Sequence, residues 1–272
     1  MSADIPTSSP AAPVTGSSPG TPVTPSASVT PARALHAEWL KFRTLASNPL
    51  TAFASLGMIV ALSGVLVWAR AGESVSTSPV ELLTGVSWAQ LLLAVLAVVF
   101  VCSEWASGTS RVTFLAVPAR WPVLLGKAAV VGAVSFVVGA LGAAGALALG
   151  AAGGVEVSAD TGLAIRLVLG AGVYLGALSV LSLGLGAIAR NLVGGILTVI
   201  GFLWVLPLAV TLIPSPVVQR LIAYLPSPAG GQLLAVENPS APLTPWAGGA
   251  VLLIWSCAAL VGATIAVRVR DI

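Results

Sequence analysis

The sequence predicts an all-α polytopic membrane protein: six transmembrane helices, with an N-terminal interfacial amphipathic helix and a disordered N-terminal tail before them. Three observations support this fold class. Of the 272 residues, 57% are hydrophobic and 8% are charged, whereas roughly 25% of an ordinary soluble domain is charged. From residue 50 onward the apolar residues form six runs of the length that crosses a bilayer, about 20 residues. The first 32 residues instead contain seven of the 19 prolines and many Ser and Thr residues.

The N-terminal segment 1–32 is too polar to form a packed core. It cannot bury enough apolar surface to offset the entropy lost on ordering, so we expect a disordered cytoplasmic tail rich in Pro, Ser and Thr. It also lacks a basic segment followed by an apolar core, which excludes a signal peptide.

Residues 33–48 have the pattern of an amphipathic helix lying at the membrane surface. In the stretch "RALHAEWLKFRTLAS", the spacing i, i+4, i+7, i+11 puts four apolar residues on one face: Leu35, Trp39, Phe42 and Ala46. Asn48 and Pro49 are predicted to end this helix and to turn the chain into the bilayer. A role as a membrane anchor explains the helix as well as a functional role does.

The six apolar runs are predicted spans, and with the interfacial helix they form one membrane domain of residues 33–272. The predicted spans are 50–69, 86–102, 123–150, 163–189, 192–213 and 246–267. Small residues recur at four-residue spacing within the third and fourth spans, which lets helix backbones approach closely. These pairs are Gly139 with Ala143, Ala146 with Gly150, and Gly172 with Gly176.

The distribution of Lys and Arg predicts which side each end faces, because basic residues are retained in the cytoplasm. With both chain ends inside, the cytoplasmic set is Arg33, Lys41, Arg43, Arg111, Arg120, Lys127, Arg190, Arg268 and Arg270. The external set is then Arg70, Arg166 and Arg220. This asymmetry predicts that both termini are cytoplasmic and that 103–127 lies in an inner loop.

Several function classes are excluded by what the chain lacks. No predicted span has a charged residue near its midpoint, whereas ion-coupled carriers usually do. The single His36 precedes the first span, and Cys102 and Cys257 have no metal-ligand spacing. The chain has no catalytic nucleophile paired with a base, no Walker A loop and no basic face for nucleic acid. We therefore expect a non-enzyme without catalytic, metal-binding or cofactor-binding residues.

The inner loop concentrates the charges of an otherwise apolar chain. Gly108 is predicted to end the second helix, Thr109 or Ser110 to cap a short surface helix, and Pro118 to stop it. Lys127 lies close enough to a span end for its side chain to snorkel to the interface. The carboxylate of Glu104 has little influence on which side of the membrane the loop faces, because Lys and Arg determine that orientation. It is therefore expected to pair with Arg111, with Lys127 or with a basic site on another protein.

Four motifs resemble the permease subunits of type-2 ABC exporters from GC-rich bacteria. They are "EWLKFRT", "SEWASGTSRVTFLAVPARWPVLLGK", "YLPSPAGG" and the terminal "RVRD". The resemblance covers residues 35–272 and excludes the tail. It implies six helices in a bacterial cytoplasmic membrane, pairing with a second permease copy or a related permease, and separate cytosolic ABC ATPase subunits that bind the ATP and Mg²⁺. Residues 214–245 would form short re-entrant helices under the outer leaflet.

The same resemblance implies two groups of site residues. The ATPase-coupling loop would contain Glu104, Gly108, Thr109, Arg111, Pro118, Arg120 and Lys127. The connecting helix beside it would contain Glu38, Trp39, Lys41 and Arg43. Two other functions stay open at this point: a carrier that works without an ATPase, and a membrane scaffold or sensor whose tail binds a partner.

Overall fold

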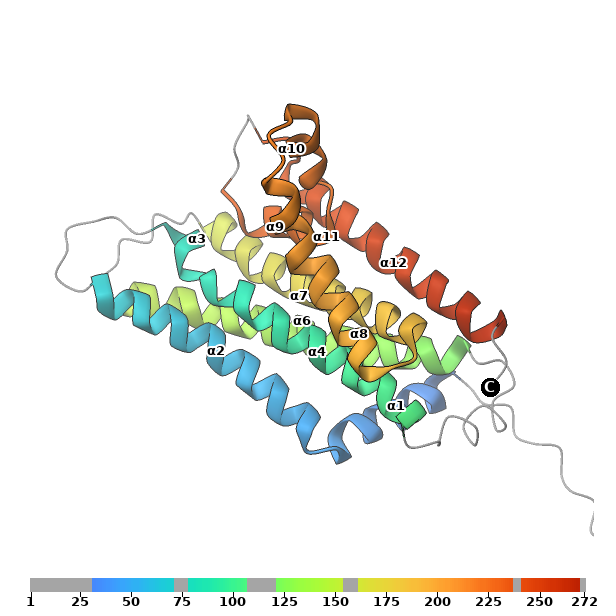
Figure 1. The fold of residues 1–272 in the computed structure, drawn as a ribbon. Helices are drawn as coiled ribbons and strands as arrows, with labels where there is room; N and C mark the ends of the chain where they lie inside the picture. The colour runs from blue at the N-terminus through green and yellow to red at the C-terminus, as the bar shows by residue number, and fades with distance from the viewer. Residues whose placement is uncertain (1–30, 71–77, 107–120, 154–160, 237–240, 270–272) are drawn as a thin grey trace, which may run out of the picture.

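The structure, a computed structural model, describes residues 31–70, 78–106, 121–153, 161–236 and 241–269. Within these ranges the regular elements are all helical (Figure 1). In chain order they are α1 Pro31–Thr44, α2 Ser47–Arg70, α3 Pro79–Leu82, α4 Thr84–Ala106, α6 Trp121–Ala152, α7 Thr161–Ala189, α8 Leu192–Ile200, the π-helix η1 Gly201–Val205, α9 Leu206–Thr211, α10 Pro216–Ile222, α11 Pro226–Gly231, the 3₁₀ helix η2 Gln232–Leu234 and α12 Pro245–Val269. Apart from its last two residues, the predicted tail 1–32 lies outside the described residues.

Six segments in the described part are long and apolar enough to cross a membrane, which confirms the predicted fold class. They are Ser47–Arg70, Pro79–Ser103, Trp121–Ala152, Thr161–Ala189, Leu192–Thr211 and Pro245–Val267. The second segment begins earlier than the predicted residue 86, because α3 continues through a short turn into α4. Pro79 is well suited to the first turn of α3, and the Ser78 hydroxyl caps it by accepting from the Val80 amide.

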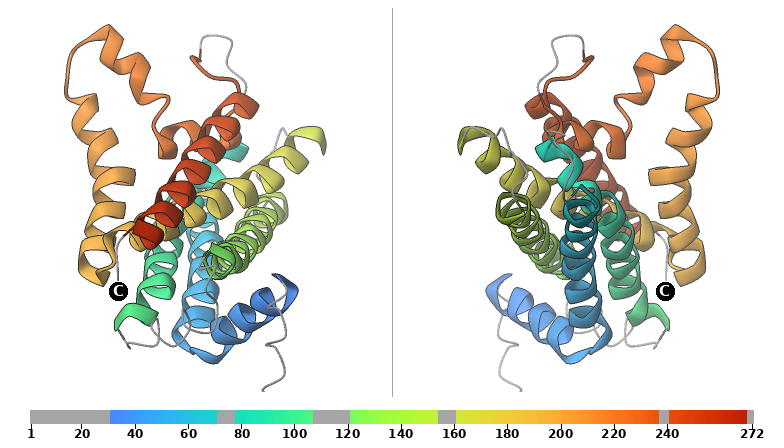
Figure 2. Two further views of the ribbon diagram at one scale, coloured as in Figure 1. Left: turned by 90° about the vertical axis from the view of Figure 1, so that its right-hand side faces the viewer. Right: turned by 90° about the vertical axis from the view of Figure 1, so that its left-hand side faces the viewer.

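Helix α7 is the centre of the bundle. In its most apolar stretch 78% of the residues are buried, against 17% for Leu192–Thr211 and 22% for α2. The two views in Figure 2 show α6, α4 and α12 arranged around α7. The less buried spans carry many exposed Leu, Val and Trp side chains, as lipid-facing helices do.

Glycine allows α6 and α7 to pack with their backbones almost in contact. A Cβ atom added at Gly139 would lie 2.5 Å from the Ala171 carbonyl oxygen. One added at Gly176 would lie 3.0 Å from the Gly132 carbonyl oxygen. The predicted packing role of the small residues in these two spans is therefore confirmed at Gly139 and Gly176.

The fifth span contains a π-helical turn. Pro207 has no backbone N–H to donate and cannot continue a regular α-helical ladder. The five residues Gly201–Val205 widen into a π-helix just before it. Just before the fifth span begins, Arg190 has a positive φ of 52°, and its side chain donates to the Ala266 carbonyl oxygen at 2.9 Å. This sharp turn joins α7 to α8 beside the end of α12.

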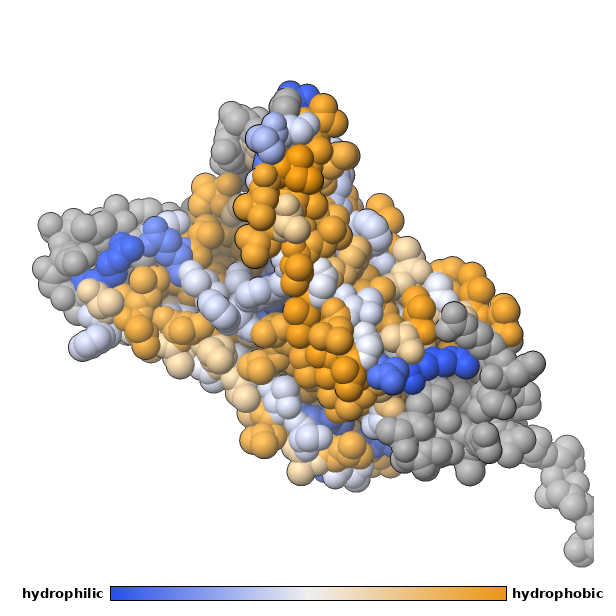
Figure 3. Space-filling model, viewed as in Figure 1, coloured by the Kyte–Doolittle hydropathy of each residue, from blue (hydrophilic) through white to orange (hydrophobic). Residues whose placement is uncertain are grey.

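The described ends of the chain lie at the same end of the bundle. Helix α1 crosses beneath the spans there, and α12 finishes nearby (Figure 2). Short helices α10 and α11 lie at the opposite end (Figure 1), so the expected short helices in 214–245 are present. Their placement under the outer leaflet remains a prediction. On the face shown in Figure 3 the most hydrophilic residues lie near the ends of the bundle.

Helix α1 corresponds to the predicted interfacial helix, but its end was predicted wrongly. It stops at Thr44, whose hydroxyl donates to the carbonyl oxygens of Leu40 and Lys41. Asn48 and Pro49 instead lie in the first turn of α2, where a proline is tolerated. The Asn48 side-chain amide donates to the Phe42 carbonyl oxygen at 3.4 Å and so holds the turn between the two helices.

Candidate functional site

Helix α1 packs against the start of α6 through a face that contains a carboxylate. Ala34, Glu38 and Phe42 follow one another at i, i+4 and i+8, and all three are buried. Gly126 makes the close approach possible, since a Cβ atom there would lie 3.4 Å from Glu38 Cγ. The buried stripe thus differs from the predicted apolar face, because Leu35 and Trp39 are 44% and 41% exposed.

Glu38 binds two lysines at once. Its Oε2 accepts from Lys127 Nζ at 2.7 Å, and its Oε1 accepts from Lys41 Nζ at 2.7 Å. The side chains of Glu38 and Lys127 are 3% and 4% exposed, whereas that of Lys41 is 39% exposed. A buried charge of either sign is costly without a partner. The pair therefore holds α1 and α6 in one relative position, although 89 residues separate its members along the chain.

An aromatic ring of α4 packs against this ion pair and continues into a row of rings on α1. Lys127 Nζ lies 4.4 Å from the centroid of the Phe100 ring, within cation–π distance. Phe100 meets Phe42 edge to face with centroids 5.6 Å apart, and Phe42 is stacked on Trp39 at 6.2 Å. We call Glu38, Lys41, Phe42, Phe100 and Lys127 the α1–α6 junction. Because it joins helices from three parts of the chain, a displacement of α1 must move α4 and α6 or break the junction.

The structure brings together only some of the predicted site residues. Glu38, Lys41 and Lys127 meet in the junction. Trp39 and Arg43 line a groove beside the junction, to which Phe42 also contributes. The backbone of Glu104 belongs to the last turn of α4, and its side chain lies outside the described part. Gly108, Thr109, Arg111, Pro118 and Arg120 also lie outside the described residues.

One sequence-based expectation about Lys127 is wrong. Its side chain does not snorkel to the interface but is buried against Glu38 and Phe100. The reason is that α1 covers the beginning of α6 and supplies both the carboxylate and part of the apolar cover. Glu38 was included among the candidate residues, but its pairing with Lys127 was not foreseen.

A second polar cluster lies inside the bundle toward the opposite end, formed by side chains of α4, α7 and α11. The Tyr174 hydroxyl on α7 donates to Gln90 Oε1 on α4. It also lies 3.3 Å from the Ser227 hydroxyl on α11. Ser227 donates to the same Gln90 oxygen at 3.4 Å. Because Gln90 and Tyr174 are buried, these bonds satisfy groups that would be costly to leave alone in an apolar environment.

We expect Tyr174→Phe to destabilise the protein by about 1–2 kcal/mol, because the buried Gln90 oxygen loses its best donor. Thermal unfolding of the purified protein in mild detergent measures the change. Tyr224→Phe is the matched control, since Tyr224 is 46% exposed and its ring hydroxyl has no hydrogen bond within the described part. Equal melting temperatures for the two variants would contradict a stabilising role for the cluster.

The described residues do not form a metal centre: they contain no cluster of three or more His, Cys, Asp and Glu side chains. Comparison with known proteins adds no identification. No protein-family model matches the chain, and no curated protein matches it either.

Proposed function

We propose that the chain is the membrane-spanning permease subunit of an ATP-driven ABC exporter, forming half of the translocation pathway. One observation carries the proposal: the α1–α6 junction. Its two buried charges come from the two segments that the motif resemblance relates to the ATPase-facing surface, "EWLKFRT" and the loop that ends at Lys127. A permease without its own energy source needs a rigid element through which movement of an ATPase reaches its helices.

The positions of the buried charges favour an exporter permease over an ion-coupled carrier. Among the described residues, the fully buried ionisable side chains of Lys, Arg, Asp and Glu are those of Glu38 and Lys127, and both lie at the α1 end of the bundle. Ion-coupled carriers place such groups along the transport path. In the proposed assembly ATP and Mg²⁺ bind to separate cytosolic ATPase subunits, and a second permease copy or a related permease completes the pathway in a bacterial cytoplasmic membrane.

Co-purification tests this function. We expect an ABC ATPase subunit to stay bound when the tagged full chain is extracted in mild detergent, and we expect vesicles that contain the complex to require ATP for export. The chain lacking residues 1–30 serves as the matched control. It should retain the ATPase, because α1 begins at Pro31 and the five residues that define the junction all come after that position.

The two other functions give different results in the same experiment. Transport by vesicles without ATP would identify an ATP-independent carrier. A partner that is lost on removal of residues 1–30, with no ATPase present in either preparation, would identify a membrane scaffold or sensor.

A further inference from the structure

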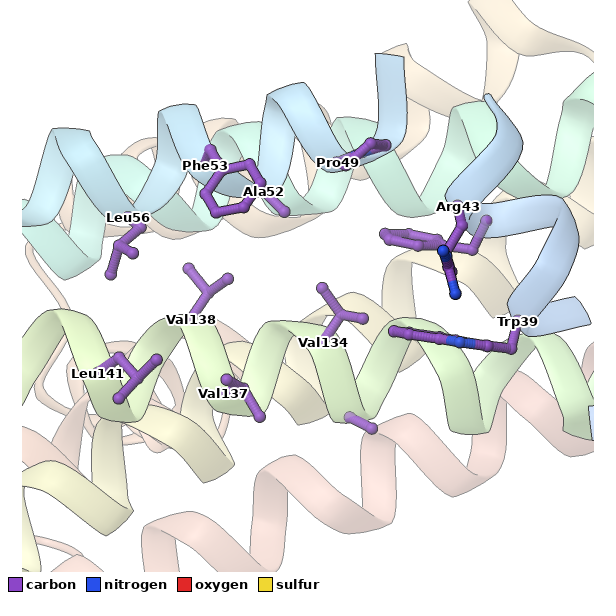
Figure 4. Close-up of a pocket in the computed structure, with 12 residues that line it drawn as sticks. Trp39, Arg43, Pro49, Ala52, Phe53, Leu56, Val134, Val137, Val138 and Leu141 are labelled. Carbon is purple, nitrogen blue, oxygen red and sulfur yellow. The ribbon is translucent and has the colours of Figure 1, made fainter. Parts of the chain in front are cut away.

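A groove of about 480 Å³ lies between α2 and α6, and α1 closes one of its ends. Figure 4 shows Trp39 and Arg43 of α1 at that end, near Pro49 at the beginning of α2. Farther along, Leu56 of α2 and Leu141 of α6 form the walls. The volume is within the range of sites for small organic molecules, roughly 300–1,000 Å³.

The walls of the groove suit a hydrocarbon chain. Apart from Arg43, the described lining consists of apolar side chains and the indole of Trp39. Phe53 is 72% exposed and Val137 is 51% exposed, although both belong to helices that span the membrane. Such side chains gain by contact with acyl chains and lose by contact with water. The groove follows two spans and therefore opens toward the hydrocarbon region.

The end of the groove at α1 carries a positive charge, in contrast to its apolar walls. Arg43 is the one charged side chain among the described residues that line the groove, and it makes no ion pair or hydrogen bond with another described residue. Trp39 lies beside it (Figure 4), and tryptophan is enriched at the level of lipid headgroups. A guanidinium group binds phosphate oxygens through two parallel N–H donors.

We propose that this groove is a binding site for an anionic phospholipid of the adjoining leaflet, with its phosphate on Arg43 and an acyl chain between α2 and α6. No Asp or Glu occurs in the described lining, so nothing there attracts the positive group of a zwitterionic headgroup. The lipid is a resident ligand and not the exported substrate. This inference requires only that the chain spans a membrane, and it does not rest on the proposed exporter function.

A lipid in this position contacts α1, α2 and α6 together. It covers Trp39 and Phe53, which are otherwise partly exposed beside the α1–α6 junction. Because it binds only the folded arrangement of these helices, it stabilises that arrangement as its concentration rises. The orientation of α1 therefore depends on the anionic lipid content of the membrane.

Native mass spectrometry of the full chain, released from detergent micelles with added phosphatidylglycerol or phosphatidylcholine, tests the site. We expect the wild type to bind phosphatidylglycerol about tenfold more tightly than phosphatidylcholine, a difference of about 1.4 kcal/mol. Arg43→Gln should remove the preference between the two lipids. Val137→Trp fills the groove and should weaken the binding of both.

Matched controls separate the groove from general effects. Arg70→Gln removes a partly exposed cation that pairs with Glu81 far from the groove, and it should leave lipid selectivity unchanged. Ile254→Trp places the same indole at an exposed position on α12 and should also leave it unchanged. If Val137→Trp fails to fold, the milder Ala133→Leu substitution gives the same test from the same wall.

Three results would overturn the proposal. One is equal binding of the two lipids by the wild type. Another is an unchanged preference in Arg43→Gln. The third is a dimer that Val137→Trp converts to a monomer, which would show that a second copy of the chain occupies the groove. None of these results bears on whether an ABC ATPase co-purifies.

Discussion

We expect Lys127→Met to lower the free energy of unfolding by about 3 kcal/mol, the low end of the range for breaking a buried ion pair. Glu38 is 3% exposed and loses the partner that lies closest to the bundle core. Lys41 still binds it, but from a position that is 39% exposed, and so compensates only in part. Reversible unfolding in mixed detergent micelles, followed by circular dichroism, measures the loss.

The double variant Glu38→Met/Lys127→Met shows whether the cost comes from the isolated carboxylate. Replacing both charges with apolar side chains of similar length removes the desolvation penalty of each, so most of the lost stability should return. Arg70→Met is the control, because its partner Glu81 is 48% exposed and exposed pairs contribute about 0–1 kcal/mol. A double variant as unstable as Lys127→Met would refute this account of the junction.

The six spans could be predicted from the sequence because they depend on a local property. A continuous apolar run must satisfy its backbone groups within one helix, so length and hydropathy are enough to locate it. The errors lie at the ends, where side-chain contacts decide. Thr44 bonds back to its own helix, and Ser78 caps a short helix before the second span.

The junction could not be predicted in the same way. The periodicity of 33–47 favoured a face with Leu35 and Trp39 because both are apolar. The observed face contains Glu38, and burying it is favourable only because Lys127 arrives from a distant part of the chain. A pattern within one helix holds no information about that partner. Gln90 was missed for a similar reason, since its hydrogen bonds come from α7 and α11.

Close helix packing could be predicted in part, less completely than the spans but better than the α1–α6 junction. The spacing of small residues indicated which faces of the third and fourth spans could approach closely. It did not indicate which residues would meet across the contact. In the structure Gly139 faces Ala171 and Gly172, and Gly176 faces Gly132, so the register between the two helices is a result of three-dimensional packing.

Gly139→Val should lower the free energy of unfolding by about 3 kcal/mol, the upper part of the usual range for overpacking. The new Cβ atom alone would lie 2.5 Å from the Ala171 carbonyl oxygen and 3.1 Å from Gly172 Cα. Both are backbone atoms, so relief requires α6 and α7 to move apart along the most buried helix of the bundle. Gly57→Val is the matched control, because a Cβ atom at Gly57 would have no described neighbour within 4 Å outside its own stretch of helix, and it should unfold like the wild type. Equal unfolding free energies for the two variants in mixed micelles would show that the α6–α7 contact adjusts easily and does not fix the centre of the bundle.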